Sequence, residues 1–208
     1  MPTRGRDMCG RYYLEEEIGD ERLAEQVRQA TRIAQKLEVK LKTSGEICPT
    51  DIAPVIAPSS LHRKTGAFPM RWGFTHPTRG MLVFNTRMET APEKDMFVGS
   101  VNDRRCLVPA SCYFEWKKLK GNKKQRYAFS AGDGTSLLLA GLYIRTSDER
   151  RLPCFTILTR EAEGEARSLH PRMPVIVPAD LAEAWLSPDT DFHEFVYSLH
   201  ASVTAQAR

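Results

Sequence analysis

The stretch RCLVPASCYFEWKK, residues 105–118, decides the fold. It contains two short apolar and aromatic runs, 105–109 and 112–118, and runs of this kind are typical of β-strands. Similar runs occur on both sides of it, and we expect further strands at 9–14, 67–74, 81–87, 125–130, 136–145 and 153–159. Many strands with few long helices are typical of the α+β class. We therefore predict a curved, mostly antiparallel and barrel-like β-sheet flanked by short helices.

One long helix is expected, at residues 21–38. Its apolar residues recur at helical spacing with charged residues between them, as in Leu23, Val27 and Ala30. Shorter helices are predicted at 92–100, 160–169, 179–186 and 190–200. The run IAPVIA, residues 52–57, reads as a strand. Because Pro54 has no N–H to donate, we expect that strand to lie near an edge of the sheet.

The composition indicates one globular domain. The chain has 208 residues, of which 41% are hydrophobic and 27% charged, which is ordinary for a folded protein. No linker or repeat marks a boundary, so we expect a single domain at 9–208, preceded by an extension at 1–8. The formal net charge of +4 permits a polyanionic partner but does not demand one.

The cysteines indicate a reducing compartment. There are five, an odd number, and the basic start MPTRGRD lacks the apolar core of a signal peptide. No apolar stretch is long enough to span a bilayer, so we expect no membrane partner. Free thiols in a cytoplasmic protein are the simplest interpretation. Without a C-x-x-C pair we expect no metal, and we expect no cofactor.

Five segments carry residues that could perform chemistry. They are Met8–Arg11, Arg71–Phe74, Asn85–Thr90, Cys106–Pro109 with Tyr113–Trp116, and Leu158–Thr159 with His170–Pro174. In this order they resemble the SRAP family, the SOS-response-associated peptidases, which includes abasic-site sensor proteins. The resemblance extends from Cys9 to about Pro178, nearly the whole chain. It implies a monomer that acts on abasic sites in single-stranded DNA and is associated with the nucleoid when bound.

Cys9 gains a second reactive group if it is the first residue of the chain. An α-amine has a pKa of about 7.7–8.0, against about 10.4 for lysine, so a useful fraction is neutral and nucleophilic at physiological pH. Amine and thiol on adjacent carbons can both add to one aldehyde. The resemblance implies that the amine forms an imine with the ring-opened sugar and that the thiol closes a thiazolidine, a stable DNA–protein crosslink.

The resemblance assigns three further catalytic residues. Glu115 would be the acid/base that takes the amine proton and helps to expel water. His170 would promote ring opening or crosslink reversal, because a histidine exchanges protons near neutral pH. Asn85 would orient the Cys9 amine and the sugar. Taken singly, each has a structural alternative: a salt bridge for Glu115, a structural histidine, and a turn or strand-end cap for Asn85.

The remaining matches concern DNA binding. Three arginines occupy the family's phosphate-contacting positions, where guanidinium forks suit phosphate: Arg11, Arg87 and Arg172. Singly, each could instead be a surface ion pair. Trp72 and Pro49 match residues that stack on or wedge between bases, although core packing is an alternative for Trp72. Thr159 matches a position that adds a hydrogen bond.

Two features depart from the family pattern. Glu46 stands where many members have Asn, and we expect its carboxylate to repel phosphates. Residues 1–7 precede Met8, and any residue joined to Cys9 turns the amine into an amide, which cannot form an imine. We therefore expect the functional chain to begin at Cys9, either through initiation at Met8 or through cleavage by the chain itself.

Two other functions fit the same residues. Cys9, His170 and Asn85 are the residue types of a thiol peptidase, whose activity could be limited to removing the segment before Cys9. A non-catalytic domain that binds single-stranded DNA is the third hypothesis. It predicts salt-sensitive binding that survives the removal of Cys9.

Overall fold

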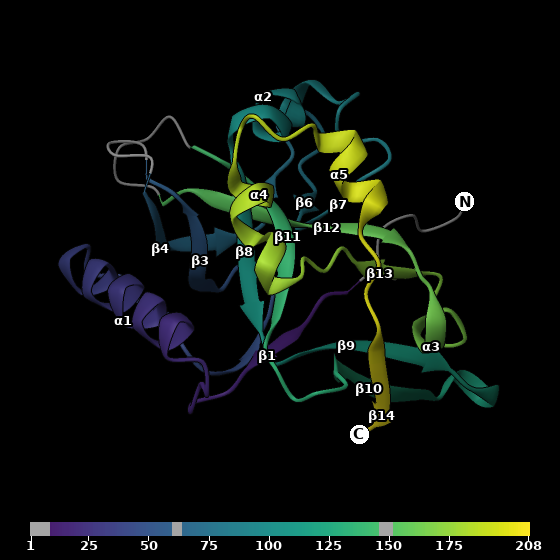
Figure 1. Ribbon diagram of the computed structural model, residues 1–208. Coiled ribbons are helices and arrows are strands. Elements are labelled where there is room, and N and C mark those ends of the chain that lie inside the picture. The colour runs from purple at the N-terminus through teal and green to yellow at the C-terminus, as the bar shows by residue number, and fades with distance from the viewer. Residues whose placement is uncertain (1–8, 60–63, 146–151) are drawn as a thin grey trace.

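A closed ring of paired strands forms the centre of the protein. The computed structural model describes residues 9–59, 64–145 and 152–208, and Figure 1 shows the arrangement. The ring consists of β3 (Ile52–Pro58), β4 (Thr65–Trp72), β8 (Arg105–Ala110), β11 (Leu137–Ile144) and β12 (Cys154–Glu161). Pairing runs β11–β8–β3–β4–β12 and returns to β11, and only the β4–β12 pair is parallel. The expectations for residues 1–8 lie outside the described residues.

Two short strands pair with β12, one along each of its edges. They are β7 (Asn85–Arg87), which is parallel to it, and β13 (Arg172–Pro174), which is antiparallel. Between β4 and β7 the chain forms a small ribbon of β5 (Phe74–Thr75) and β6 (Leu82–Val83). The chain therefore delivers two predicted site segments, 85–87 and 172–174, to one strand.

A second, entirely antiparallel sheet continues directly from the ring. Its order is β14–β10–β9–β1–β2. The strands are β1 (Tyr12–Leu14), β2 (Gly45–Ile47), β9 (Cys112–Lys118), β10 (Lys124–Ala131) and β14 (Val203–Ala207). Only Ser111 separates β8 from β9, so the stretch 105–118 passes from one sheet into the other. The α+β class and the mostly antiparallel sheet are thus confirmed.

Two details of the strand prediction are wrong. The strand around Pro54 is not near an edge, because β3 pairs with β4 on one side and with β8 on the other. Pro54 is tolerated because it faces Pro69, which also lacks a donor, and because the β8 pairing consists of Ile56 opposite Leu107 alone. The C-terminal strand β14 was not predicted, because two of the three apolar residues in its alternating sequence VTAQA are alanine, a residue that is depleted in strands.

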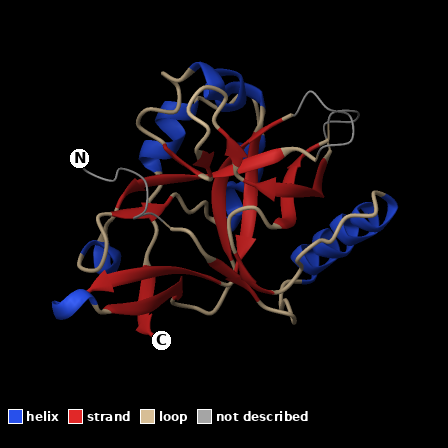
Figure 2. Ribbon diagram, turned by 180° about the vertical axis from the view of Figure 1, so that it is seen from behind, coloured by secondary structure: helices blue, strands red, loops and turns tan. Residues whose placement is uncertain are grey.

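The long helix α1 (Glu21–Lys36) matches its prediction closely. Its N-cap Asp20 accepts a hydrogen bond from the Leu23 N–H, and the helix packs beside β3 and β4 (Figure 2). The others are α2 (Asp95–Asp103), α3 (Gly164–Arg167), α4 (Ala182–Leu186) and α5 (Phe192–Ser198), with 3-10 turns at Lys120–Asn122 and Ala179–Leu181. The helix expected at 160–169 is shorter, because β12 extends to Glu161.

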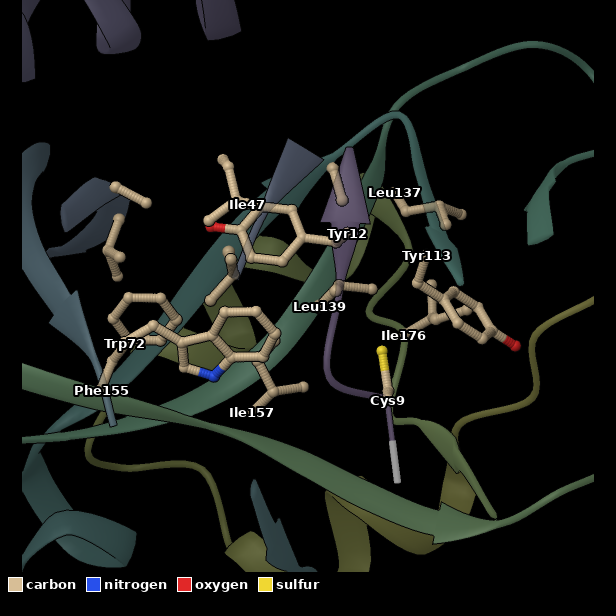
Figure 3. Packing of buried hydrophobic residues seen from close by; sticks show 14 of the residues in the cluster. Cys9, Tyr12, Ile47, Trp72, Tyr113, Leu137, Leu139, Phe155, Ile157 and Ile176 are labelled. Atoms are coloured by element: carbon tan, nitrogen blue, oxygen red, sulfur yellow. The ribbon is translucent and has the colours of Figure 1, made fainter. Parts of the chain in front are cut away.

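The core that supports the site contains large aromatic side chains. Trp72 is 0% exposed, stacks on Phe155 with ring centroids 6.2 Å apart, and donates its indole N–H to the Phe84 carbonyl at 2.8 Å. Tyr12 packs against the same indole at 5.2 Å. Figure 3 shows that Cys9 lies at one side of this cluster, near Ile176 and Tyr113. The N-terminal residue of the described chain is therefore part of the core.

Candidate active site

Cys9 is held beside strand β9 by the pairing of β1. Tyr12 is opposite Tyr113, and one step further the Phe114 N–H donates to the Arg11 carbonyl at 2.9 Å. Cys9 lies two residues before Arg11 in the same extended segment, and it is 1% exposed. Its thiol points into the core (Figure 3) and lies 3.7 Å from the Arg11 carbonyl oxygen. Backbone pairing between β1 and β9 therefore positions Cys9, whatever contacts its own side chain makes.

Asn85 contacts Cys9 directly. It opens β7, whose pairing with β12 places it opposite Ile157 and buries its side chain. Its Nδ2 donates to the Cys9 carbonyl oxygen at 2.8 Å. Within the described ranges, its Oδ1 is buried and accepts no hydrogen bond. A buried acceptor without a donor is costly, so this atom is a place where a donor of a substrate or of a freed amine would be stabilised.

Glu115 and His170 form a second close pair. Glu115 is buried in β9, and His170 is buried just after α3, where its N–H donates to the Ala166 carbonyl at 2.9 Å. The His170 Nδ1 lies 2.9 Å from the Arg172 carbonyl oxygen and 3.8 Å from the Glu115 Oε1. A carboxylate and an imidazole therefore lie next to each other inside the protein.

The Cys9 thiol is kept protonated by its surroundings. Burial raises the pKa of the thiol well above its usual value, and the negative charge of Glu115 raises the pKa further. A thiolate is therefore scarce at neutral pH. A nucleophilic thiolate, which a thiol peptidase requires, is disfavoured at this position.

An open pocket of about 690 Å³ brings these residues together with part of the predicted DNA contacts. Arg11, Pro49, Glu115 and His170 all line it. A neighbouring pocket of about 1220 Å³ is lined by Asn85, and the two pockets share Phe84. The two hollows therefore meet at Phe84, next to Asn85.

Glu46 has a different role from the expected repulsion. One of its carboxylate oxygens pairs with Arg11 and the other with Arg126, each at 2.5 Å. The two guanidinium groups also lie over the Trp116 ring, at 5.5 and 6.0 Å from its centroid. Two positive charges surround one negative charge, so this cluster is cationic overall.

The other two predicted arginines differ in whether their guanidinium groups are already paired. Arg172 donates to both Glu89 carboxylate oxygens at 2.7 and 2.8 Å and to the Thr159 carbonyl at 2.6 Å. Burial acts to raise the pKa of Glu89, but the hydrogen bonds from Arg172, a backbone hydrogen bond and the positive charges of Arg172 and Arg87 together lower the pKa. Arg87 is exposed, and no ion pair is found for it within the described residues. Arg87 is available to a phosphate, whereas Arg172 is already engaged.

Three predicted DNA contacts are placed very differently from one another. Trp72 has no exposed face, so the prediction that it stacks on a base is wrong for this structure, and core packing describes it. Thr159 is also fully buried, with its hydroxyl 3.5 Å from the Thr86 carbonyl. Pro49 lines the pocket, in a turn where the Thr50 N–H donates to the Trp72 carbonyl at 2.8 Å. Trp72 thus supports Pro49 from the core.

The pocket also contains cations that we did not predict. Lys117, Lys118 and Lys124 line it beside Glu115. The run KKLKGNKKQR, residues 117–126, directly follows the Glu115–Trp116 motif and was a readable signal for a basic surface.

Metal-binding and membrane-spanning features are absent from the described ranges. Within 9–59, 64–145 and 152–208, no cluster of three or more His, Cys, Asp or Glu side chains is arranged to hold a metal ion. All five cysteines are free thiols. In those ranges, too, no helix combines the length and the apolar character needed to cross a membrane.

Known proteins match this chain over most of its length. Abasic site processing protein YoqW of Bacillus subtilis is 28% identical over 200 residues, covering 92% of this chain and 86% of that protein. Abasic site processing protein YoaM of the same organism is 31% identical over 137 residues, covering 62% of this chain and 60% of YoaM. A crystal structure of a Bacteroides thetaiotaomicron protein shares the fold, with a TM-score of 0.74 at 20% identity, covering 96% of this chain and 91% of that one.

The family comparison extends over both sheets and all four candidate catalytic residues. The family described as SOS response associated peptidase (SRAP) matches residues 8–207. The match includes Cys9, Asn85, Glu115 and His170 in the order in which the sequence presents them. This chain therefore belongs to the SOS response associated peptidase (SRAP) family.

Proposed function

We propose that this protein processes abasic sites in single-stranded DNA and bonds to them covalently through the amine and thiol of Cys9. The observation that carries the proposal is the contact between Asn85 and the Cys9 carbonyl, 2.8 Å long and beside the Glu115–His170 pair. Relatives named abasic site processing proteins support the choice of substrate.

The reaction begins at the amine. A neutral Cys9 amine adds to the aldehyde carbon of the ring-opened sugar, and loss of one water gives an imine. The free Oδ1 of Asn85 is the acceptor that would hold the amine during this step. Glu115 takes the amine proton, and His170 promotes ring opening or, later, reversal.

The thiol completes the ring. Its sulfur adds to the imine carbon, its proton leaves, and the imine nitrogen takes up a proton, which gives a five-membered thiazolidine. Because burial and Glu115 raise the pKa of this thiol, the proton stays on sulfur until the attack. The carboxylate whose charge suppresses the thiolate is also a base that can receive that proton. The same group thus protects the thiol and assists its reaction.

Arg11 and Arg87 bind the flanking phosphates in this proposal, and Pro49 contacts a base at the rim. Two surface hollows that share Phe84 leave room for a strand on both sides of the abasic nucleotide. The raised pKa of the Cys9 thiol argues against the thiol peptidase as the main activity, although the chain could still remove its own leading segment.

Intact mass spectrometry tests the proposal. A chain that begins at Cys9 and one that retains residues 1–8 in uncleavable form are each mixed with an abasic single strand. We expect the first to gain the mass of the oligonucleotide less one water, and the second to bind without a covalent product. Residues 1–8 still attached in the crosslinked product would overturn the amine mechanism, and a thiol-only or lysine-based adduct would replace it.

A further inference from the structure

The turn between β9 and β10 concentrates positive charge next to the candidate active site. We define the basic hairpin as residues 116–126, WKKLKGNKKQR, which contain five lysines, one arginine and no acidic residue. The six positive charges exceed the formal net charge of +4 of the entire chain. Its tip stands at the edge of the molecule, away from α1, in both views (Figures 1 and 2). Such a concentration is the electrostatic footprint of a polyanion-binding surface.

The pairing of the hairpin places like charges face to face. Lys118 is directly opposite Lys124, an arrangement that destabilises an antiparallel pair. Lys120, Lys123 and Lys124 are exposed, and no ion pair is found for these three within the described ranges. An anion lying along the hairpin would offset this repulsion.

The basic hairpin is continuous with the catalytic pocket. Lys117 follows Glu115 by two positions on β9, so both side chains leave the same face of the strand. Lys117, Lys118 and Lys124 line the pocket that also contains Glu115 and His170. At about 3.3 Å per residue, the hairpin tip begins roughly 10–15 Å beyond Glu115. A strand whose sugar is at Glu115 therefore has its neighbouring phosphates within reach of these lysines.

We propose that the basic hairpin is an accessory docking surface for the sugar–phosphate backbone that flanks the abasic nucleotide. It contacts phosphates rather than base edges, since its exposed charges are lysines and the Arg11 and Arg126 guanidinium groups lie over the ring of Trp116, the one aromatic residue of the hairpin. It raises affinity and leaves the bond-forming step unchanged, because the lysines do not touch the reacting atoms. The inference rests on the proposed function and adds a second surface to it.

The test removes two exposed charges at the tip of the hairpin. The hairpin variant is Lys120→Gln/Lys123→Gln, which leaves the pocket-lining lysines in place, and the matched control is Lys36→Gln/Lys40→Gln, two exposed lysines on another segment; this pair of changes is the smallest that removes more than one hairpin charge. Fluorescence anisotropy measures binding to an intact single strand between 50 and 200 mM salt. We expect the hairpin variant to lower the log–log salt slope by about 1.4, because each phosphate that a lysine no longer neutralises lowers it by about 0.7. The control should keep the parent slope.

Single-turnover crosslinking at saturating DNA separates this inference from the proposed function. The hairpin variant should crosslink at the parent rate, with saturation shifted to higher DNA concentration. A parent that binds salt-dependently but never crosslinks overturns the proposed function, while the binding data still test the hairpin. If the hairpin variant keeps the parent affinity and slope, or if the control is weakened as much, the docking surface is wrong.

A competitor identifies the class of anion. Poly-glutamate of matched charge is added to the parent and to the hairpin variant. We expect weak competition for the hairpin, because its lysines are spread along a strand and face phosphates at regular spacing. If the variant no longer binds poly-glutamate but retains DNA binding, the partner is an acidic protein, and the proposal fails. Unchanged thermal unfolding of the variant excludes a folding defect, since removing like charges does not weaken the hairpin.

Discussion

The candidate site has a buried floor and an exposed rim, and the two differ in how much water reaches their side chains. The floor consists of Cys9, Asn85, Glu115 and His170, all buried and fixed by backbone pairing or short hydrogen bonds. The rim consists of exposed cations, among them Arg11, Arg87 and the basic hairpin. Burial strengthens electrostatic effects on reactivity at the floor, whereas water and salt weaken each contact at the rim.

This difference indicates that bond formation and DNA binding can be altered separately. Floor substitutions should change the covalent reaction while leaving reversible binding intact. Rim substitutions should change affinity and its salt dependence by small, additive steps.

The largest effect is expected from Cys9→Ala in a chain that begins at residue 9. Removal of the thiol abolishes the stable covalent product, while the arginines still bind the strand reversibly. Denaturing gel electrophoresis after heating measures the product. Borohydride should still trap an imine, because the alanine amine remains. A heat-stable adduct formed at normal yield by this variant contradicts thiazolidine formation.

The next effect concerns proton transfer at the floor. Glu115→Gln should slow crosslinking by about a hundredfold or more, since it removes the acid/base beside Cys9. His170→Ala should also slow formation or reversal. Single-turnover time courses measure both, with the surface variant Glu183→Gln as control. Time courses identical to the parent for both floor variants would assign these two residues to structural roles.

Thiol reactivity probes the floor without DNA. The ordinary pKa of a cysteine thiol is 9.0, and that of Cys9 is raised above it. The Cys9 thiol therefore keeps its proton as the pH increases through 9.0. Each unit of increase lowers the thiolate fraction about tenfold. At pH 8 iodoacetamide should therefore label Cys9 at least about tenfold more slowly than the half-buried Cys48, as read by peptide mass spectrometry.

Denaturation provides the reference for that comparison. In urea the two cysteines should label at similar rates, because burial and the Glu115 charge no longer act on Cys9. Fast labelling of Cys9 in the folded protein would instead favour the thiol peptidase.

The smallest effect distinguishes two rim arginines. Arg87→Ala should lower the log–log salt slope by about 0.7, which corresponds to a two- to threefold change in affinity across 50–200 mM salt. Arg172→Ala should leave that slope unchanged and lower the melting temperature, since it leaves Glu89 and the Thr159 carbonyl without this donor. Equal slope changes in both variants would show that Arg172 leaves Glu89 to bind phosphate.

The local sequence pattern was enough to predict most helices and strands, but not which strands pair with each other. The helical spacing in 21–38 and the apolar runs in 105–118 identified α1, β8 and β9 correctly. Pro54 misled because its effect on a strand depends on which neighbour it faces, and the neighbour is Pro69. Strand β14 has only a weak local signal, since two of its three apolar residues are alanine, and it is held in the sheet by its pairing with β10.

The sequence by itself determined the class of the fold, the order of the motifs and the residue types available for the chemistry. Only the tertiary structure decided which of them meet. It joined Asn85 to Cys9 across 76 positions, paired Arg172 with Glu89, and enclosed Trp72 in the core. The reason is physical: propensity and periodicity act between near neighbours, whereas burial and charge pairing depend on strands brought together from distant parts of the chain.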